Sequence, residues 1–342
     1  MSELNRIRYS VLDIAPVMSG STSAQALRNT LDLARRAEEF GFHRYWLAEH
    51  HNTGSIASSS PAVLAGQVAA STASIRVGSG GVMLPNHQPL VVAEQFGTLA
   101  ALHPGRIDLG LGRAPGGDPL TAQALRRDPQ NGVDFPEQVR EILGYATGEN
   151  PITANPVPDE WPPVWILGSG GGGPRTAGEL GLPFASAHHF TPQNTVPGLQ
   201  LYRRSFRPSR WLQEAYAVVA AVVVLADTDA EAQRLAASLE IAHLKMLRGK
   251  LGPYVSPEEA DREPFTAAER QMAKDSFVPQ FVGGPETVRR SLGALVRASG
   301  ADEIMALTIV HDHAARVRSY ELLAQVCASL PLSPESAVAG AE

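Results

Sequence analysis

Short runs of β-branched and other apolar residues alternate along this chain with longer stretches in which apolar residues recur at helical spacing. Eight runs are long enough to form strands, and they cover residues 8–14, 43–48, 75–83, 106–111, 164–167, 184–187, 216–225 and 303–309. Helical patterns follow most of them, for example at 61–73, 90–102, 229–247 and 314–329. This alternation is typical of repeated βαβ units around a parallel sheet. Eight units predict an α/β fold of the (β/α)8 TIM barrel type.

Two long segments interrupt the alternation. Residues 112–163, after the fourth strand, hold one helical pattern around 137–145 among many prolines and glycines, which predicts an excursion over the surface. Residues 248–284, after the seventh strand, are polar and show no strand signal, so they predict a second excursion or a lid. No Ser/Pro-rich linker divides the chain, and we expect a single domain over residues 1–342 with a frayed end over residues 331–342.

Composition and charge narrow the choice of partners. The chain is 44% hydrophobic and 19% charged, which provides enough apolar material for a large core. The formal net charge is −6, whereas proteins that bind nucleic acid or an anionic membrane usually carry concentrated positive charge. We therefore expect a small-molecule partner. Cys327 is the only cysteine, and no apolar run reaches the roughly 18 residues that span a bilayer. These features predict a cytoplasmic protein without a disulfide.

A run of glycines is the clearest candidate for a binding site. Active sites of TIM barrels lie at the C-terminal ends of the strands. After the fifth strand, Ser169 leads into Gly170, Gly171, Gly172 and Gly173, and Pro174 then begins a helix. The N–H groups of such a loop can approach an anion closely, and the helix adds the positive end of its dipole. The run fits neither a nucleotide P-loop nor a dinucleotide-binding loop. It predicts a phosphate site, with a flexible barrel loop as the alternative.

Two further features can contact the same ligand. Arg113 directly follows the fourth strand and can form a charge-assisted hydrogen bond to the phosphate, although a solvated or ion-paired arginine is the plainer interpretation. Gly80 and Gly81 interrupt an otherwise apolar strand, which weakens the strand and needs a reason. A flat ring lying against the strand is one reason, and a tight bend of the barrel is the other.

Histidines follow two of the strands. Alternation along the second strand places His50 on the face of Trp46 and opposite to Glu49, so His50 can act as a proton donor or acceptor at the mouth. A hydrogen-bonded rim histidine is the alternative. A metal-dependent hydrolase is a rival from another class, and its possible ligands are His50, His51, His188, His189 and Asp108. The first strand carries no histidine, which disfavours that rival, and we expect no metal.

Four segments in register resemble the luciferase-like monooxygenase family. They are WLAEHH at 46–51, VGSGGVMLP at 77–85, PGRIDLGLGR at 104–113 and VWILGSG at 164–170, with GELGLP at 178–183 and VGGPETV at 282–288 in support. The resemblance covers nearly the whole chain. It implies a barrel that binds FMN, or in some branches the deazaflavin F420, over the ends of the strands.

The resemblance also implies roles for individual residues. His50 matches the family's active-site histidine, and Gly80-Gly81 matches a pair joined by a non-prolyl cis peptide beneath the flavin ring. Arg113 matches a phosphate-binding arginine, and Ser169 and Gly170 begin the phosphate loop. Gly112 stands where bacterial luciferase has a reactive cysteine, so light emission is not expected. A second phosphate-binding arginine has no clear counterpart, and Arg175 and Arg140 are the candidates.

These roles predict a flavin-dependent monooxygenase. We expect reduced FMN from a separate NAD(P)H-dependent flavin reductase to add O2 at its C4a carbon, and the peroxyflavin to oxygenate a small organic substrate. The sequence carries no nicotinamide fingerprint of its own. The family also implies a homodimer. The alternatives are an F420-dependent enzyme that transfers hydride on the same barrel, and a flavin-binding protein without turnover.

Overall fold

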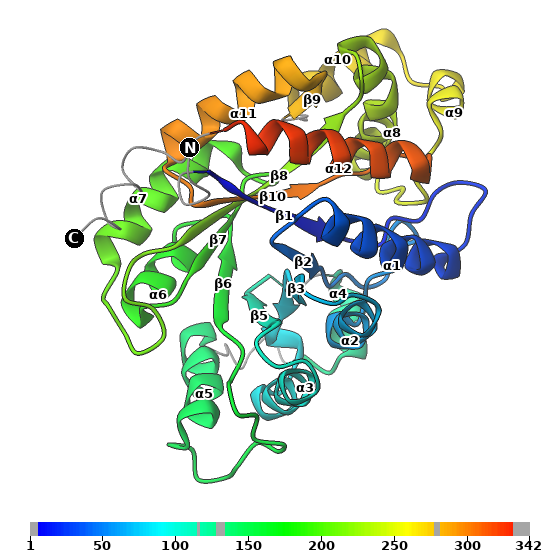
Figure 1. The fold of residues 1–342 in the computed structure, drawn as a ribbon. Helices are drawn as coiled ribbons and strands as arrows, with labels where there is room; N and C mark the ends of the chain where they lie inside the picture. The colour runs from blue at the N-terminus through cyan, green and yellow to red at the C-terminus, as the bar shows by residue number, and fades with distance from the viewer. Residues whose placement is uncertain (1–5, 115–116, 128–133, 277–280, 331–342) are drawn as a thin grey trace.

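Eight parallel strands close into a barrel in the computed structural model, which describes residues 6–114, 117–127, 134–276 and 281–330 (Figure 1). The barrel strands are β1 (Arg8–Asp13), β2 (Arg44–Leu47), β3 (Arg76–Ser79), β5 (Ile107–Gly112), β6 (Val164–Gly168), β7 (Phe184–Ala187), β8 (Ala217–Leu225) and β10 (Glu303–Leu307). They pair in chain order, and β10 pairs in parallel with both β1 and β8, which closes the cylinder. The predicted (β/α)8 barrel is confirmed. The chain after residue 330, expected to fray, lies outside the described residues.

Helices surround the strands (Figure 1). They include α1 (Ser23–Glu39), α2 (Pro61–Ser71), α3 (Pro89–Leu102), α5 (Phe135–Thr147), α6 (Gly172–Leu180), α7 (Thr195–Ser205), α11 (Pro285–Ser299) and α12 (His313–Ala328). The Thr22 side chain caps α1 by accepting from the Gln25 N–H, and Leu33 and Ala37 lie on its buried face. The sequence interpretation missed α7, because Pro197 and Gly198 obscure its helical pattern. No helix within the described ranges combines the length and the apolar character needed to cross a bilayer.

Two details of the predicted strands are corrected. The predicted strand 75–83 is broken at Gly80-Gly81, and its second part, β4 (Val82–Met83), pairs with β5. The expectation of no strand within 248–284 is wrong, because β9 (Phe281–Gly283) pairs with β8. β8 runs past the last residue that β10 reaches, Val222, and leaves backbone groups that β9 satisfies. Three residues are too few to show a period-two pattern.

Both excursions carry helices. The first holds α4 (Pro119–Ala124) and α5, and the second follows α8 (Asp229–Leu247) with α9 (Pro257–Arg262) and α10 (Ala267–Ser276). α8, α9 and α10 lie together on one side of the barrel (Figure 1). The second excursion is tied to the loop after β1, where the Ser19 N–H donates to the Tyr254 carbonyl at 2.8 Å. The first is tied to the loop after β2, where the Asn52 side-chain amide donates to Asp118 at 2.6 Å. Both excursions therefore border the mouth formed by the C-terminal ends of the strands.

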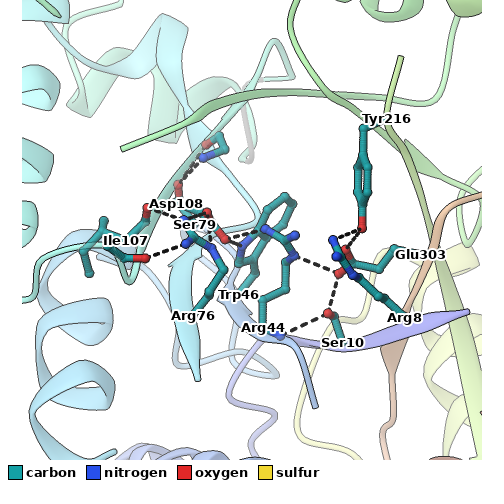
Figure 2. A network of polar contacts seen from close by, with 12 residues as sticks. Arg8, Ser10, Arg44, Trp46, Arg76, Ser79, Ile107, Asp108, Tyr216 and Glu303 are labelled. Carbon is teal, nitrogen blue, oxygen red and sulfur yellow. Dashed lines mark hydrogen bonds and ion pairs between the residues drawn. The ribbon is translucent and has the colours of Figure 1, made fainter. Parts of the chain in front are cut away.

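A buried ionic network (Figure 2) lies at the opposite, N-terminal end of the barrel, because Arg44 and Glu303 are the first residues of β2 and β10. The Arg44 guanidinium pairs with Asp108 at 2.7 Å and with Glu303 at 2.8 Å, and Arg76 pairs with the other oxygen of Asp108 at 2.6 Å. The Trp46 Nε1–H also donates to Asp108, at 3.0 Å. Burial by itself raises the pKa of the Asp108 carboxyl, but Arg44 and Arg76 outweigh it and hold the pKa below its usual value. Asp108 is thus a structural anion, far from the mouth.

Candidate functional site

The glycine run forms an open loop between β6 and α6. The Ser169 carbonyl accepts hydrogen bonds from the Thr191 hydroxyl at 2.8 Å and from the Asn194 amide at 3.0 Å, so the β7–α7 connection holds the loop in place. A Cβ atom added at Gly170 or Gly171 would meet nothing within 4 Å, which shows that this part of the loop faces open space. No side chain caps the first turn of α6. Its N–H groups are therefore available to an anion.

Arg113 converges on this loop from the neighbouring strand. β5 and β6 are in register at Gly112 and Leu167, so the residues after both strands reach the mouth side by side. A Cβ atom at Gly172 would lie 3.3 Å from Nη1 of Arg113, which means that the guanidinium rests against the first residue of α6. Arg113 is exposed and forms no ion pair within the described part of the chain. A free cation beside uncapped N–H groups is an arrangement that binds an anion.

The two other candidate arginines are already paired with carboxylates. Arg140 binds Glu137 within α5, and Nη1 of Arg175 lies 4.0 Å from Glu179 within α6. All four side chains are on the surface. Of these three arginines, Arg113 alone lies against the loop and has no carboxylate partner among the described residues.

The glycine pair in the third strand is required by the packing of the protein itself. A Cβ at Gly80 would lie 2.7 Å from the Leu12 side chain and 3.0 Å from Trp46, and a Cβ at Gly81 would lie 2.8 Å from the Gly110 carbonyl oxygen. The Gly80-Gly81 peptide is cis, as the resemblance implies. Close packing at a bend therefore accounts for both glycines, and a contact with a ring stays a prediction.

Glu49 anchors a cluster beside this pair. Its buried carboxylate accepts from His51 Nε2 at 2.8 Å, from His87 Nε2 at 2.9 Å and from the Met83 N–H at 2.9 Å. Burial alone raises the pKa of Glu49, but the hydrogen bonds from His87 and His51 outweigh it and lower the pKa. Sequence reasoning did not find this cluster, because His87 is 38 residues away from Glu49.

His50 lies apart from the Glu49 cluster at the mouth. Its ring is half-buried, and its Nδ1 atom is sealed from solvent without a hydrogen-bond partner among the described residues. Burial lowers the pKa of His50, and the nearby charge of Glu49 opposes the shift. The two histidines after β7 are held separately: His188 Nδ1 lies 2.9 Å from the Thr195 hydroxyl, and His189 binds the Ala220 carbonyl. A positive charge on His50 lowers the pKa of His189.

Two possible ligands of the metal-hydrolase interpretation are engaged elsewhere in the structure. Asp108 lies at the opposite end of the barrel, and His51 is bound to Glu49. Within the ranges that the structure describes, no group of three or more His, Cys, Asp or Glu side chains is placed to hold a metal ion.

The fold and the site define a class of protein: a (β/α)8 barrel with an open glycine loop and an arginine on one side of its mouth, and with histidines after two other strands. The sequence profile of luciferase-like monooxygenases matches residues 7–303. The chain belongs to the luciferase-like monooxygenase family.

Relatives in this family match over almost their whole length. The chain is 51% identical over 321 residues to the Bacillus subtilis protein YvbT, covering 93% of this chain and 96% of that protein. It is 45% identical over 324 residues to a luciferase-like monooxygenase of Escherichia coli K12, covering 94% and 97%. The crystal structure of apo-MsnO8 is 38% identical and superposes with a TM-score of 0.89 over 95% of this chain and 99% of that one.

More distant neighbours carry two different cofactors. The oxygenating constituent of 3,6-diketocamphane monooxygenase from Pseudomonas putida, solved with FMN, has a TM-score of 0.71 at 19% identity, covering 96% of this chain and all (100%) of that one. An F420-dependent secondary alcohol dehydrogenase has a TM-score of 0.66 at 14% identity, covering 94% and 99%. At these identities the likeness shows the shared fold alone. A nearer relative, 34% identical over 329 residues and covering 93% of this chain and 97% of that protein, is the N-acetyl-S-alkylcysteine monooxygenase of Bacillus subtilis.

Proposed function

We propose that this protein is the oxygenating component of a flavin-dependent monooxygenase. It takes reduced FMN from a separate NAD(P)H-dependent flavin reductase and uses O2 to oxygenate a small organic substrate. The observation that carries the proposal is the position of the Arg113 guanidinium against Gly172, at the uncapped start of α6. Family membership and the FMN complex of a structural neighbour support the same cofactor.

The residues at the mouth fit a phosphate dianion. Gly170 and Gly171 face open space, so an anion can approach their N–H groups without meeting a side chain. Arg113 supplies the compensating charge, and Ser169 is fixed by Thr191 and Asn194, so the loop needs little reorganisation to bind. Ser169, Gly170–Gly173 and Arg113 would thus hold the FMN phosphate.

The remaining roles follow from position. Bound reduced FMN supplies the activation of O2 for transfer of one oxygen atom to the substrate. Gly80 and Gly81, which are joined by a cis peptide, would lie beneath the ring, as membership of the family implies. His50 would donate or accept a proton near the ring, since burial keeps its imidazole neutral near pH 7. The two excursions would shape the substrate pocket and exclude water.

We also propose that the chain acts as a single domain in the cytoplasm and forms a homodimer. Large apolar side chains stand exposed near the starts of two adjacent helices: Val63 of α2 is 66% exposed and Val91 of α3 is 45% exposed. Burial of such side chains favours association of two copies. Light scattering during gel filtration tests this, and a monomer at micromolar concentration would contradict it.

An F420-dependent dehydrogenase is the second candidate, because a structural neighbour uses that cofactor on the same fold. Anaerobic titrations of the protein with reduced FMN and with reduced F420 separate the two, and the proposal requires tighter binding of FMN. A single turnover with ¹⁸O₂ then tests oxygenation. An N-acetyl-S-alkylcysteine is the first substrate class to try, given the relative named for it. Product carrying ¹⁸O supports the monooxygenase, and hydride transfer without O2 consumption supports the F420 enzyme. Tight FMN binding with no product from any substrate supports a protein that only binds flavin.

A further inference from the structure

The tautomer of His189 is determined by its hydrogen bonds. Its backbone N–H donates to the Ala220 carbonyl at 3.1 Å, and its ring Nδ1 lies 3.0 Å from the same oxygen. A carbonyl oxygen only accepts hydrogen bonds, so Nδ1 must carry the ring proton. Nε2 of the neutral ring is then a lone-pair acceptor. Nε2 of His189 has no hydrogen-bond partner within the described part of the chain, and solvent can reach it.

His50 has the opposite arrangement. Its Nδ1 atom is sealed in the protein with no partner among the described residues. A sealed N–H without an acceptor costs more free energy than a sealed lone pair without a donor, so the proton of neutral His50 is favoured on Nε2. The two rings thus present one N–H donor and one lone-pair acceptor at the same mouth.

Both rings are neutral near pH 7. Burial lowers the pKa of His189 to about 4, although the hydrogen bond to the Ala220 carbonyl opposes the shift. Charges on His188 and His50 lower the pKa of His189 further. Burial also lowers the pKa of His50. Glu49, the nearby carboxylate, raises the pKa of His50 but is itself bound to His51.

An exposed aromatic ring lies next to His189. Phe190 is 67% exposed, and its ring centroid is 4.3 Å from that of His189. The following residue, Thr191, holds the Ser169 carbonyl of the phosphate loop. Phe190 therefore provides an exposed apolar surface beside the histidine, where an organic body can pack.

We propose that His50 and His189 form a matched donor and acceptor pair that recognises the substrate. His50 Nε2–H donates and His189 Nε2 accepts, so the pair selects a polar group that has both functions, such as a hydroxyl or a secondary amide. An apolar body attached to that group packs on Phe190. This inference rests on the proposed function, since it places the substrate at the mouth beside the flavin site.

The tautomers are tested first, on the full chain without flavin. Histidine labelled with ¹⁵N reports through its nitrogen chemical shifts which ring nitrogen carries the proton, and the single variants His189→Asn and His50→Asn assign the signals. We expect His189 protonated on Nδ1, His50 protonated on Nε2, and no titration of His189 between pH 8 and about pH 5. A His189 ring protonated on Nε2, or one that titrates between about pH 6 and pH 7, overturns the proposal.

Recognition is tested with three small probes of similar shape. Phenol can donate and accept, anisole only accepts weakly, and toluene does neither. We expect phenol to shift the Nε2 signal of His189 and to bind about three- to tenfold tighter than anisole, the gain of one net hydrogen bond. No shift with phenol at millimolar concentration, or equal affinities for phenol and anisole, overturns the proposal.

A pair of variants separates this role from a structural one. His189→Asn can keep a donor near the Ala220 carbonyl but places no atom where Nε2 was, whereas His189→Gln places an amide oxygen near that position. We expect the preference for phenol to disappear in His189→Asn and to return in part in His189→Gln, at unchanged melting temperature and FMN affinity. Loss of the preference in both variants together with loss of stability shows a structural role only. If the protein does not bind FMN but both histidines have the expected tautomers, the proposed function is refuted and the donor and acceptor assignment of His50 and His189 is retained.

Discussion

Replacement of Arg113 by alanine gives the sharpest test of the phosphate site. The guanidinium rests against Gly172 at the start of α6, and no other arginine of the loop region is without a carboxylate partner among the described residues. Arg113→Ala removes one charge-assisted contact and leaves the N–H groups of the loop in place. We therefore expect weaker binding of FMN without loss of the site.

The magnitude follows from the exposure of the side chain. A hydrogen bond to a charged group contributes about 1.5–3 kcal/mol when it is well made. Arg113 is exposed, and solvent screening reduces the gain to the lower part of that range, about 1.5–2 kcal/mol. At about 1.4 kcal/mol for each factor of ten, the dissociation constant for FMN should rise about 10- to 30-fold.

Fluorescence titrations with FMN and with riboflavin provide the assay and its internal control. Riboflavin lacks the phosphate, so Arg113→Ala should leave its affinity unchanged. Arg175→Ala, which removes an exposed arginine of α6 that pairs with Glu179, is the matched control and should leave both affinities near wild type. Added salt should weaken FMN binding more in the wild type than in Arg113→Ala. Equal loss of FMN and riboflavin, or wild-type affinity for FMN, would refute the reasoning.

Three more outcomes are expected. His50→Ala should bind FMN almost normally but form ¹⁸O-labelled product about 10²- to 10⁴-fold more slowly, and a wild-type rate removes it from the mechanism. Gly172→Ala should push the Arg113 guanidinium aside and weaken FMN about three- to tenfold in the same titration, at unchanged stability; unchanged affinity would show that the contact is not needed. Asp108→Ala should lower the free energy of unfolding by about 3–5 kcal/mol in urea, against less than about 1 kcal/mol for the exposed Asp227→Ala. Because folding lowers the pKa of Asp108, its stabilisation is present above the unfolded value near pH 4 and is lost as the pH falls through the folded pKa. The difference from wild type should therefore shrink below about pH 4, and a difference that grows on acidification contradicts the assignment.

Much of this protein can be derived from local pattern alone. Period-two runs and helical spacing locate the barrel strands and most of the helices around them. Burial of one face of an element requires apolar residues at regular, short intervals along the sequence. The glycines at 170–173 and 80–81 also stand out locally, since glycine weakens regular structure and needs a reason where it recurs. Elements with weak local signals were missed, such as α7, which contains Pro197 and Gly198, β9, which has only three residues, and the short helices of the two excursions.

Closure of the barrel determined which residues of the site contact one another. Parallel strands bring all their C-terminal ends to one rim, so residues that are distant in the sequence meet there. Arg113 meets Gly172, and His189 meets Ala220, and no sequence spacing specifies either contact. The same closure carried Asp108 to the opposite end, where two arginines bind it. Local sequence thus determined which groups are available, and only the tertiary structure determined which of them face each other, because register and closure are properties of the whole sheet.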